Sequence, residues 1–292
     1  MEELDKKQTK DRKILDLERL GFNDFRVVGH YNYKSVGKNL AMHLHTGMME
    51  IIYLTKGHQY YKIVDQEYML KGGDVLVIPP DTVHGTSRYP EDIGSLYWVV
   101  FRIPIDKKRL LNLTPSESQY IVGQFLNLQA RHFKGNAKMV TTLTRIFKYY
   151  DPKQKIKSRV RLTSLLLQFV LEVIDASKRN SLNSATSPEM NRVLQHIDDH
   201  LLNDLFIESL ADLSHLSISR FKHRFKKEIG IPPGEFIMRK KIDFAKNHYH
   251  QYNSIQSLAF SLGFSSSNYF ASVFKKFTGS TPSDYFIKQQ RE

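Results

Sequence analysis

Residues 205–290 contain the same sequence pattern twice, and this duplication limits what the chain can fold into more than any other feature. The residues that recur are Ser209-Leu210-Ala211 as Ser257-Leu258-Ala259, Phe225-Lys226-Lys227 as Phe274-Lys275-Lys276, Gly230 as Gly279, Pro233 as Pro282 and Phe236 as Tyr285. The first triplet returns after 48 residues and the others after 49. An offset that holds over several residue types indicates a duplicated supersecondary unit.

The first copy predicts two short helices separated by a tight turn. The first helix covers roughly residues 207–213, and Ser214-His215-Leu216 forms the turn. Ser217 is suited to cap the second helix and Gly230 to end it. The apolar residues of the second helix fall four apart and form a buried stripe: Phe221, Phe225 and Ile229. Its opposite face carries polar and basic residues: Ser219, Arg220, Lys222, His223 and Lys226.

The second copy repeats this plan. A short helix is expected at 257–262, a turn at Gly263-Phe264 and a second helix at 266–277. The residues expected to face inward are Phe270, Val273, Phe274 and Phe277, and those expected to face outward are Ser267, Asn268, Ala271, Ser272 and Lys275.

Two helices joined by a short turn, the second of them amphipathic, are typical of a helix-turn-helix motif that binds DNA. The major groove admits one helix, in which Lys and Arg contact phosphates while a few other side chains reach base edges. Two units joined by one helix, from Pro233 to about Tyr249, would enter two successive grooves. A helical domain with a solvated basic face is the alternative, and the duplication weighs against it.

Residues 188–290 resemble the DNA-binding domain of the AraC/XylS family of transcription regulators. The resemblance is carried by residues 255–264, Tyr269-Phe270, Phe274-Lys275-Lys276 and 279–282. It implies base-reading positions in the two helices at Ser219, Lys222, His223, Ser267, Asn268 and Ser272. Arg220, Lys226 and Lys275 complete the predicted DNA-binding set. The second helix presents only short side chains outward, where the family often has longer ones, and this favours backbone contacts there.

Composition bounds the remaining possibilities. The 292 residues suggest two domains, and 41% hydrophobic residues are usual for a globular protein. We expect no membrane span, because no run of eighteen apolar residues occurs, and no signal peptide, because residues 1–19 are charged throughout. The absence of Cys excludes disulfides and thiolate metal sites and fits a cytoplasmic protein. The net charge is +13, of which residues 188–292 carry only +3, so the DNA-binding prediction depends on local placement.

The sequence pattern of the N-terminal half is typical of a β-barrel or β-sandwich. Short β-rich runs alternate with turn residues, and the expected strands are 26–33, 40–45, 50–54, 60–64, 74–78 and 96–103. The turn signals between them include Lys56-Gly57 and Lys71-Gly72-Gly73. Residues 1–22 are expected to form a polar arm, partly helical around 14–20.

Three histidines and one glutamate form a constellation within these strands. His43 and His45 lie two apart, so on a strand they point to the same face, and Glu50 and His84 can converge on them. Such a set suits a divalent transition metal, or a small-ligand pocket in which the same residues form hydrogen bonds. With Gly37, Gly57, Gly73 and Pro79, it resembles the two motifs of the cupin superfamily.

The resemblance to AraC-type regulators favours the pocket without a metal, because their cupin-like domains usually bind sugars or other small effectors. The predicted effector-binding residues are therefore His43, His45, Glu50, His84 and Trp98, and the first four are the metal ligands if a metal is present. Trp98, the only tryptophan, is expected to pack in the core, or alternatively to stack on a sugar ring.

Helices are expected at about 115–130, 137–149 and 155–179. The last carries an apolar stripe that fits domain core or a dimer interface: Val160, Leu162, Leu165, Leu166, Phe169, Val170 and Val173. The family resemblance favours a homodimer. A polar linker is expected at 181–187, and a helix from Pro188 to about Leu202 that packs on the first helix-turn-helix motif.

These expectations combine into an α+β chain: an arm at 1–22, a cupin-like effector-binding and dimerisation domain at 23–180, the linker, and an all-α DNA-binding domain at 188–292. The predicted protein is not an enzyme but a cytoplasmic transcription regulator. Its partners would be double-stranded DNA, a small effector such as a sugar, a second copy, and RNA polymerase if it activates. The alternatives are a cupin metalloenzyme fused to a DNA-binding domain, and a DNA binder that needs no effector.

Overall fold

The computed structural model describes residues 4, 6–104, 109–128, 130–179 and 186–289. The chain divides into two compact units. The first comprises residues 1–33, 39–89 and 94–184, and the second comprises 185–292 together with the short segments 34–38 and 90–93. Most of the linker expected at 181–187 lies outside the described residues. No helix in the described part of the chain is both long and apolar enough to cross a membrane.

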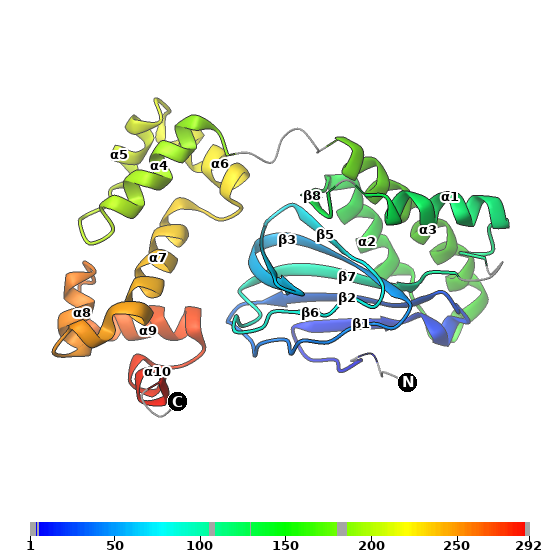
Figure 1. The fold of residues 1–292 in the computed structure, drawn as a ribbon, viewed down its shortest axis with the longest axis horizontal. Coiled ribbons are helices and arrows are strands. Elements are labelled where there is room, and N and C mark those ends of the chain that lie inside the picture. The colour runs from blue at the N-terminus through cyan, green and yellow to red at the C-terminus, as the bar shows by residue number, and fades with distance from the viewer. Residues whose placement is uncertain (1–3, 5, 105–108, 129, 180–185, 290–292) are drawn as a thin grey trace. The chain divides into compact units, whose positions relative to one another are not determined.

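The first unit is built on an eight-stranded sheet (Figure 1). The strands are β1 (Arg12–Asp16), β2 (Phe25–Tyr33), β3 (Met48–Ile63), β4 (Gln66–Lys71), β5 (Asp74–Ile78), β6 (His84–Gly85), β7 (Gly94–Arg102) and β8 (His132–Lys134). The main path runs β1-β2-β7-β3-β5-β8, and β4 and β6 also pair with β3. All of these pairs are antiparallel.

Strand β3 corrects three of the expectations. The separate strands predicted at 50–54 and 60–64 are one strand, and the turn predicted at Lys56-Gly57 is an irregularity within it. Gly57 has a φ of +94°, a conformation that a glycine adopts without strain. Before this point β3 pairs with β5 and β7, and after it with β4 and β6. The strand predicted at 40–45 is also wrong, because that segment has only short bridges, one of them joining His43 to His84.

The bend in β3 gives the sheet an interior. Alternate residues of β3 and β7 point to opposite faces, as the strand period requires. On one face of the sheet, buried side chains from several strands form a hydrophobic cluster, which we call the interior cluster. Its members are Ile14, Val27, Tyr31, Met48, Ile52, Leu54, Tyr61, Ile63, Leu70, Leu76, Ile78, Leu96, Trp98 and Val100. The other face packs on helices. The N-terminal unit is therefore barrel-like, with an apolar interior and a helical cover over the outside of the sheet.

The N-terminal arm is shorter than predicted. The helical part expected around residues 14–20 is confined to a 3₁₀ helix, η1 (Leu17–Leu20), and the residues before it form strand β1. Strand β1 pairs with β2 along its whole length, and Ile14 belongs to the interior cluster. Over so few positions, the pattern of apolar and polar residues in this segment fits both the period of a helix and the period of a strand. Pairing with β2 makes residues 12–16 a strand.

Hydrogen bonds and ion pairs to the buried carboxylate of Asp74 on β5 hold β8 in the sheet. The Asp74 carboxylate accepts hydrogen bonds from His132 at 2.8 Å, from the Lys71 amide at 2.8 Å and from Lys134. Burial alone would raise the pKa of Asp74, but its partners on β8 hold it below the usual value. Burial next to Asp74 also raises the pKa of Tyr53 to about 12.

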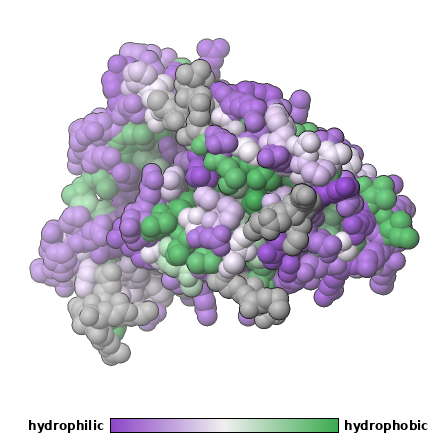
Figure 2. All heavy atoms as spheres, turned by 45° about the vertical axis from the view of Figure 1, so that its right-hand side comes forward, coloured by the Kyte–Doolittle hydropathy of each residue, from purple (hydrophilic) through white to green (hydrophobic). Residues whose placement is uncertain are grey.

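Three helices cover the outer face of the sheet (Figure 1). They are α1 (Pro115–Leu126), α2 (Ala137–Tyr149) and α3 (Lys155–Arg179), with the short turn η2 (Pro152–Gln154) before α3. Thr114 caps α1 through a capping box with Glu117. The stripe predicted on α3 is domain core, with one exception: Val160 is 68% exposed. Hydrophobic side chains also reach the surface on the side of this unit seen in Figure 2.

Within the described residues 186–289 of the second unit, all regular elements are helices. It contains α4 (Pro188–Asp199), α5 (Ile207–Leu213), α6 (Ile218–Ile229), α7 (Pro233–His248), η3 (Tyr249–Gln251), α8 (Ile255–Ser261), α9 (Ser267–Thr278) and α10 (Pro282–Gln289). Two separate apolar cores divide it. One lies among α4, α5, α6 and the start of α7, and the other among the end of α7, α8, α9 and α10.

The helix ends of the two motifs are those that the repeat predicts. Ser217 caps α6 and Ser266 caps α9 by accepting a hydrogen bond from the third residue of each helix. Gly230 and Gly279 end the helices with φ values of +91° and +82°. Because the duplicated residues are caps and core positions, the two copies have the same fold.

Candidate functional site

The histidine and glutamate cluster is assembled by backbone pairing rather than by one strand. The His43 amide donates to the His84 carbonyl at 2.9 Å, and the His84 amide donates to the His43 carbonyl at 2.8 Å. This bridge brings the loop with His43 and His45 against β6. Glu50 lies on β3, where its neighbour two residues on, Ile52, belongs to the interior cluster. The four side chains therefore converge from three segments.

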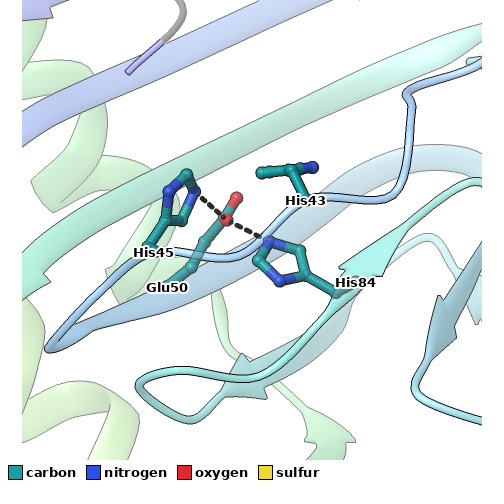
Figure 3. Close-up of side chains that lie close together, drawn as sticks. All are labelled: His43, His45, Glu50 and His84. Atoms are coloured by element: carbon teal, nitrogen blue, oxygen red, sulfur yellow. Dashed lines mark hydrogen bonds and ion pairs between the residues drawn. The ribbon is translucent and has the colours of Figure 1, made fainter. Parts of the chain in front are cut away.

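Glu50 is the centre of the cluster (Figure 3). One of its oxygens, Oε2, lies 3.2 Å from His45 Nε2 and 2.9 Å from His84 Nε2. The His43 ring lies 4.3 Å from the His84 ring and 4.9 Å from the His45 ring, between centroids. One nitrogen or oxygen atom from each of the four residues can be chosen so that all lie within 4.8 Å of one another.

Backbone carbonyls orient two of the imidazoles. Nδ1 of His43 lies 2.9 Å from the Ala41 carbonyl, and Nδ1 of His84 lies 2.8 Å from the Thr82 carbonyl. Because a carbonyl only accepts, both Nδ1 atoms carry hydrogen and both Nε2 atoms are left for the site. Metal-binding histidines in proteins are usually held by such a hydrogen bond on the other nitrogen.

His84 has an acceptor at each ring nitrogen. The Thr82 carbonyl lies at Nδ1, and the Glu50 carboxylate lies at Nε2. A neutral ring carries only one N–H and satisfies one of them. The arrangement therefore calls for a positive charge next to Nε2, supplied by a second ring proton or by a bound cation.

The pKa shifts of the cluster agree with this charge distribution. Burial alone would raise the pKa of Glu50, but the hydrogen bonds from His45 and His84 hold it well below its usual range. Burial lowers the pKa of His43. The lowered pKa of Glu50 favours its carboxylate form, and the lowered pKa of His43 favours its neutral imidazole form. This donor set can bind a divalent transition metal, and it can also hydrogen-bond hydroxyl groups of a small ligand.

Trp98 lies on β7, and its side chain belongs to the interior cluster. It packs directly on Gly29, where an added Cβ would lie 2.0 Å from the indole ring. The Arg12 guanidinium lies 4.9 Å from the centre of the ring. Core packing, the first of the two roles expected for Trp98, accounts for these contacts.

The five residues predicted to contact DNA on α6 are all exposed: Ser219, Arg220, Lys222, His223 and Lys226. Their helix buries the opposite stripe completely, since Phe221 and Phe225 are both 0% exposed. Arg224 does not belong to the outward face. It binds Glu228 of its own helix and Glu189 of α4, and so ties α6 to α4.

On α9 the predicted residues Asn268, Ser272 and Lys275 are exposed, and Ser267 is half-buried. The hydroxyl of Ser272 donates to the Asn268 carbonyl at 3.0 Å. This side chain is thereby held against its own helix.

Tyr269 is an exposed residue on α9 that the predicted set omits. Its side chain is 49% exposed, and its ring lies 5.7 Å from that of Phe264 in the turn before the helix. The repeat contains the signal that would have found it. Tyr269 stands 49 residues after Arg220, which is in the set. A phenol at this position is the longest uncharged polar side chain on the exposed face of α9.

Two family models match the chain. The AraC-like ligand binding domain matches residues 36–170. The helix-turn-helix domain matches residues 210–288. The first match covers His43, His45, Glu50, His84 and the interior cluster except Ile14, Val27 and Tyr31. The second match begins within α5 of the first helix-turn-helix motif and covers the rest of both motifs.

Curated relatives are similar over most of their length. The HTH-type transcriptional activator RhaS of Escherichia fergusonii is 24% identical over 256 residues, covering 85% of this chain and 87% of the relative. RhaS of Shigella sonnei is 24% identical over 253 residues, with the same coverage. Among solved structures, ToxT from Vibrio cholerae matches 91% of this chain and 98% of its own at 14% identity and a TM-score of 0.34. The DNA-binding domain of AdpA in complex with a target DNA matches 36% of this chain and 96% of its own at 23% identity and a TM-score of 0.35.

A barrel-like unit with a polar cluster, followed by two helix-turn-helix motifs, defines a DNA-binding transcription regulator with its own ligand-binding domain. The matches to the ligand-binding model, the helix-turn-helix model and the RhaS activators agree on the kind of regulator. The chain belongs to the AraC family.

Proposed function

We propose that this regulator is an activator controlled by a small molecule that binds at His43, His45, Glu50 and His84. The observation that carries the proposal is the convergence of three imidazoles and a buried carboxylate in the ligand-binding unit. The name of the RhaS relatives, transcriptional activators, supports the direction of regulation. RNA polymerase would then be a further partner, and the protein would act in the cytoplasm, with the DNA, without catalysing a reaction.

A carbohydrate is the effector class that we favour. Its hydroxyl groups both donate and accept, so that they can bind the Glu50 carboxylate and the imidazoles of His43 and His45 together. An effector changes regulation only if it binds one arrangement of the chain better than another. Strand β1 is paired with β2, so Arg12–Asp16 do not belong to a movable arm.

The test is a genome-fragment selection on the purified full chain, without and with a panel of sugars. Recovery of one or a few sites upstream of sugar-use genes, with an occupancy that one sugar changes, would support the proposal. Recovery of specific sites whose occupancy no sugar changes would contradict the effector class and leave DNA binding intact.

A divalent metal ion is the second candidate ligand of the same residues. The observation that favours it is His84, whose ring has an acceptor at both nitrogens. A cation on Nε2 would remove this conflict, and His43, His45 and Glu50 would supply the other ligands. Elemental analysis of the purified protein and of a His84→Ala variant tests this candidate. About one metal per chain in the parent and none in the variant would support it, and a metal-free parent that also fails to bind added zinc or manganese would exclude it.

We further propose that the chain is a homodimer through α1 and α3. Opposite its core stripe, α3 bears a second row of apolar residues at helical spacing, of which Ile156, Val160 and Leu171 are 81%, 68% and 42% exposed. Tyr120 of α1, 57% exposed, lines a groove with Leu171. A helix with two apolar faces is stable in water when both are covered, and a second copy covers the same face on both partners.

Analytical ultracentrifugation of the parent, Val160→Asp and a control checks the dimer. The expected result is a dimeric parent and a monomeric Val160→Asp variant. The control is Val64→Asp, which changes an apolar residue that is 56% exposed in a turn of the same unit. A monomeric parent, or a Val160→Asp variant that remains dimeric, would contradict the proposal.

A further inference from the structure

Helix α7 buries two charged side chains, Arg239 and Lys241, and Lys241 lies within the apolar stripe of the helix. Ile237, Lys241 and Ala245 fall four apart and share a face of the helix. Ile237 belongs to the core of the first helix-turn-helix motif, and Ala245 belongs to the core of the second. Lys241 therefore stands at the seam between the two cores.

The burial of Lys241 is unusual for a lysine. The residue is 6% exposed, whereas lysine is rarely buried to this degree without a partner. Burial lowers the pKa of its ammonium group, and the nearby carboxylate of Asp204 opposes this change. An apolar residue would fill this place without the desolvation cost. The buried charge therefore indicates that the groups around the ammonium interact with it.

Both motifs approach the ammonium group. Gly263 lies in the turn between α8 and α9 and has a φ of +72°. A Cβ at Gly263 would lie 3.3 Å from Lys241 Nζ and 3.8 Å from Asp204 Oδ1. Asp204 belongs to the loop before α5, in the first motif. The turn of the second motif, the loop of the first and the side chain of the connecting helix thus meet at one point.

We propose that Lys241 is a positioning residue that sets the first helix-turn-helix motif against the second. Its ammonium group attracts Asp204 of one motif and packs against the Gly263 turn of the other. Through these contacts it fixes the separation and angle of α6 and α9. Successive major grooves on one face of DNA are roughly 34 Å apart, so the fixed separation determines which spacing of half-sites the chain can read.

The absence of Cys from the sequence allows a direct measurement. Spin labels are attached to cysteines introduced at Lys227 and Lys276, which are exposed, equivalent positions on α6 and α9. Double electron–electron resonance spectroscopy then gives the distribution of distances between the two spin labels in the full chain, without DNA. This measurement is independent of the operator, the effector and the metal.

Lys241→Met removes the charge and keeps the length of the side chain, and Asp204→Asn removes the charge that faces it. The control is Lys246→Met on the same helix, whose ammonium group binds Asp243 of that helix. Thermal unfolding of each variant is recorded in parallel, because a residue that only stabilises the fold would lower the melting temperature without altering the distances in the folded protein.

The expected result is a broadened or shifted distance distribution for Lys241→Met and Asp204→Asn and an unchanged one for Lys246→Met. A Lys241→Met distribution that superimposes on that of the parent would overturn the proposal, as would an equal change in Lys246→Met. If Lys241→Met fails to fold, Asp204→Asn decides in the same way, because Asp204 is exposed and its substitution leaves both cores intact.

Discussion

Replacing Phe225 by alanine gives a sharp test of the two separate cores in the DNA-binding unit. The side chain of Phe225 is 0% exposed and belongs to the first core. Its ring lies 5.6 Å from that of Phe221 and 5.5 Å from that of Phe236, in edge-to-face arrangements. The substitution leaves a cavity that the surrounding helices fill only in part.

The cost follows from this environment. Phe-to-Ala changes in protein cores cost roughly 3–5 kcal/mol, which includes the lost aromatic pairs. That is a large share of the roughly 5–15 kcal/mol that stabilises a typical domain. Since about 1.4 kcal/mol is a factor of ten in an equilibrium constant, we expect the first motif to open roughly a hundred- to a few-thousand-fold more often.

Hydrogen exchange of the full chain, read by mass spectrometry, measures this opening peptide by peptide. Exchange in α4, α5 and α6 should accelerate in Phe225→Ala, while α9 and α10 stay close to the parent. Phe274→Ala, at the equivalent buried position of the second core, should give the reverse pattern. Ile218→Ala is the surface control on α6, where the side chain is 39% exposed and should matter little.

Two outcomes would refute the reasoning. Exchange in α6 of Phe225→Ala that equals the parent would mean that the buried stripe is wrongly assigned. An equal acceleration in both motifs would mean that the two cores unfold as one, despite their separation in the structure.

Three further variants test the other parts of the molecule. Lys222→Ala should weaken DNA binding; if Lys222 contacts only phosphate, affinity should fall equally on all sequences, and the slope of log affinity against log salt should drop by roughly 1, whereas an unchanged slope would contradict the contact. His43→Ala combined with His84→Ala should abolish the response to the effector and leave DNA binding intact, as judged by reporter output and gel shift; a retained response would remove the cluster from the proposal. Asp74→Asn should destabilise the first unit at neutral pH. Because the folded-state pKa of Asp74 is lowered, this stabilisation is present above the usual carboxyl pKa of about 4 and is lost as pH falls below it, so the melting temperatures of parent and variant should converge in acid rather than stay parallel.

The DNA-binding unit was predictable almost residue by residue, because its signals are local. A serine cap, a glycine stop and apolar residues four apart each act within one helix, and the repeat supplies every signal twice. The predicted bounds of the helices ending at Ile229 and near Thr278 differ from the observed ones by a residue at most. What the repeat did not reveal is Lys241, which lies outside the duplicated residues and acquires its place only when both cores close around α7.

The barrel was predictable in kind but less so in detail. Apolar runs indicated strands, yet a run of residues does not tell where a strand bends or which strand it pairs with. Lys56-Gly57 has the composition of a turn and is an irregularity inside β3, because two sets of partners hold β3 on both sides of it. Residues 12–16 had no signal strong enough to mark a strand, and only their pairing with β2 makes them one.

The sequence by itself determined the fold class, the family and the identity of the four clustered residues, since these depend on residue types at fixed spacings. Only the tertiary structure decided how the cluster is built. His43 and His45 do not share a strand; a backbone bridge to His84 brings their rings to Glu50. The tertiary structure also decided that most of the α3 stripe is core and that Val160 is not. The physical reason is the same in each case. Hydrogen bonds and burial between distant segments exist only once the chain has folded, and a local sequence pattern does not specify which distant segments will meet.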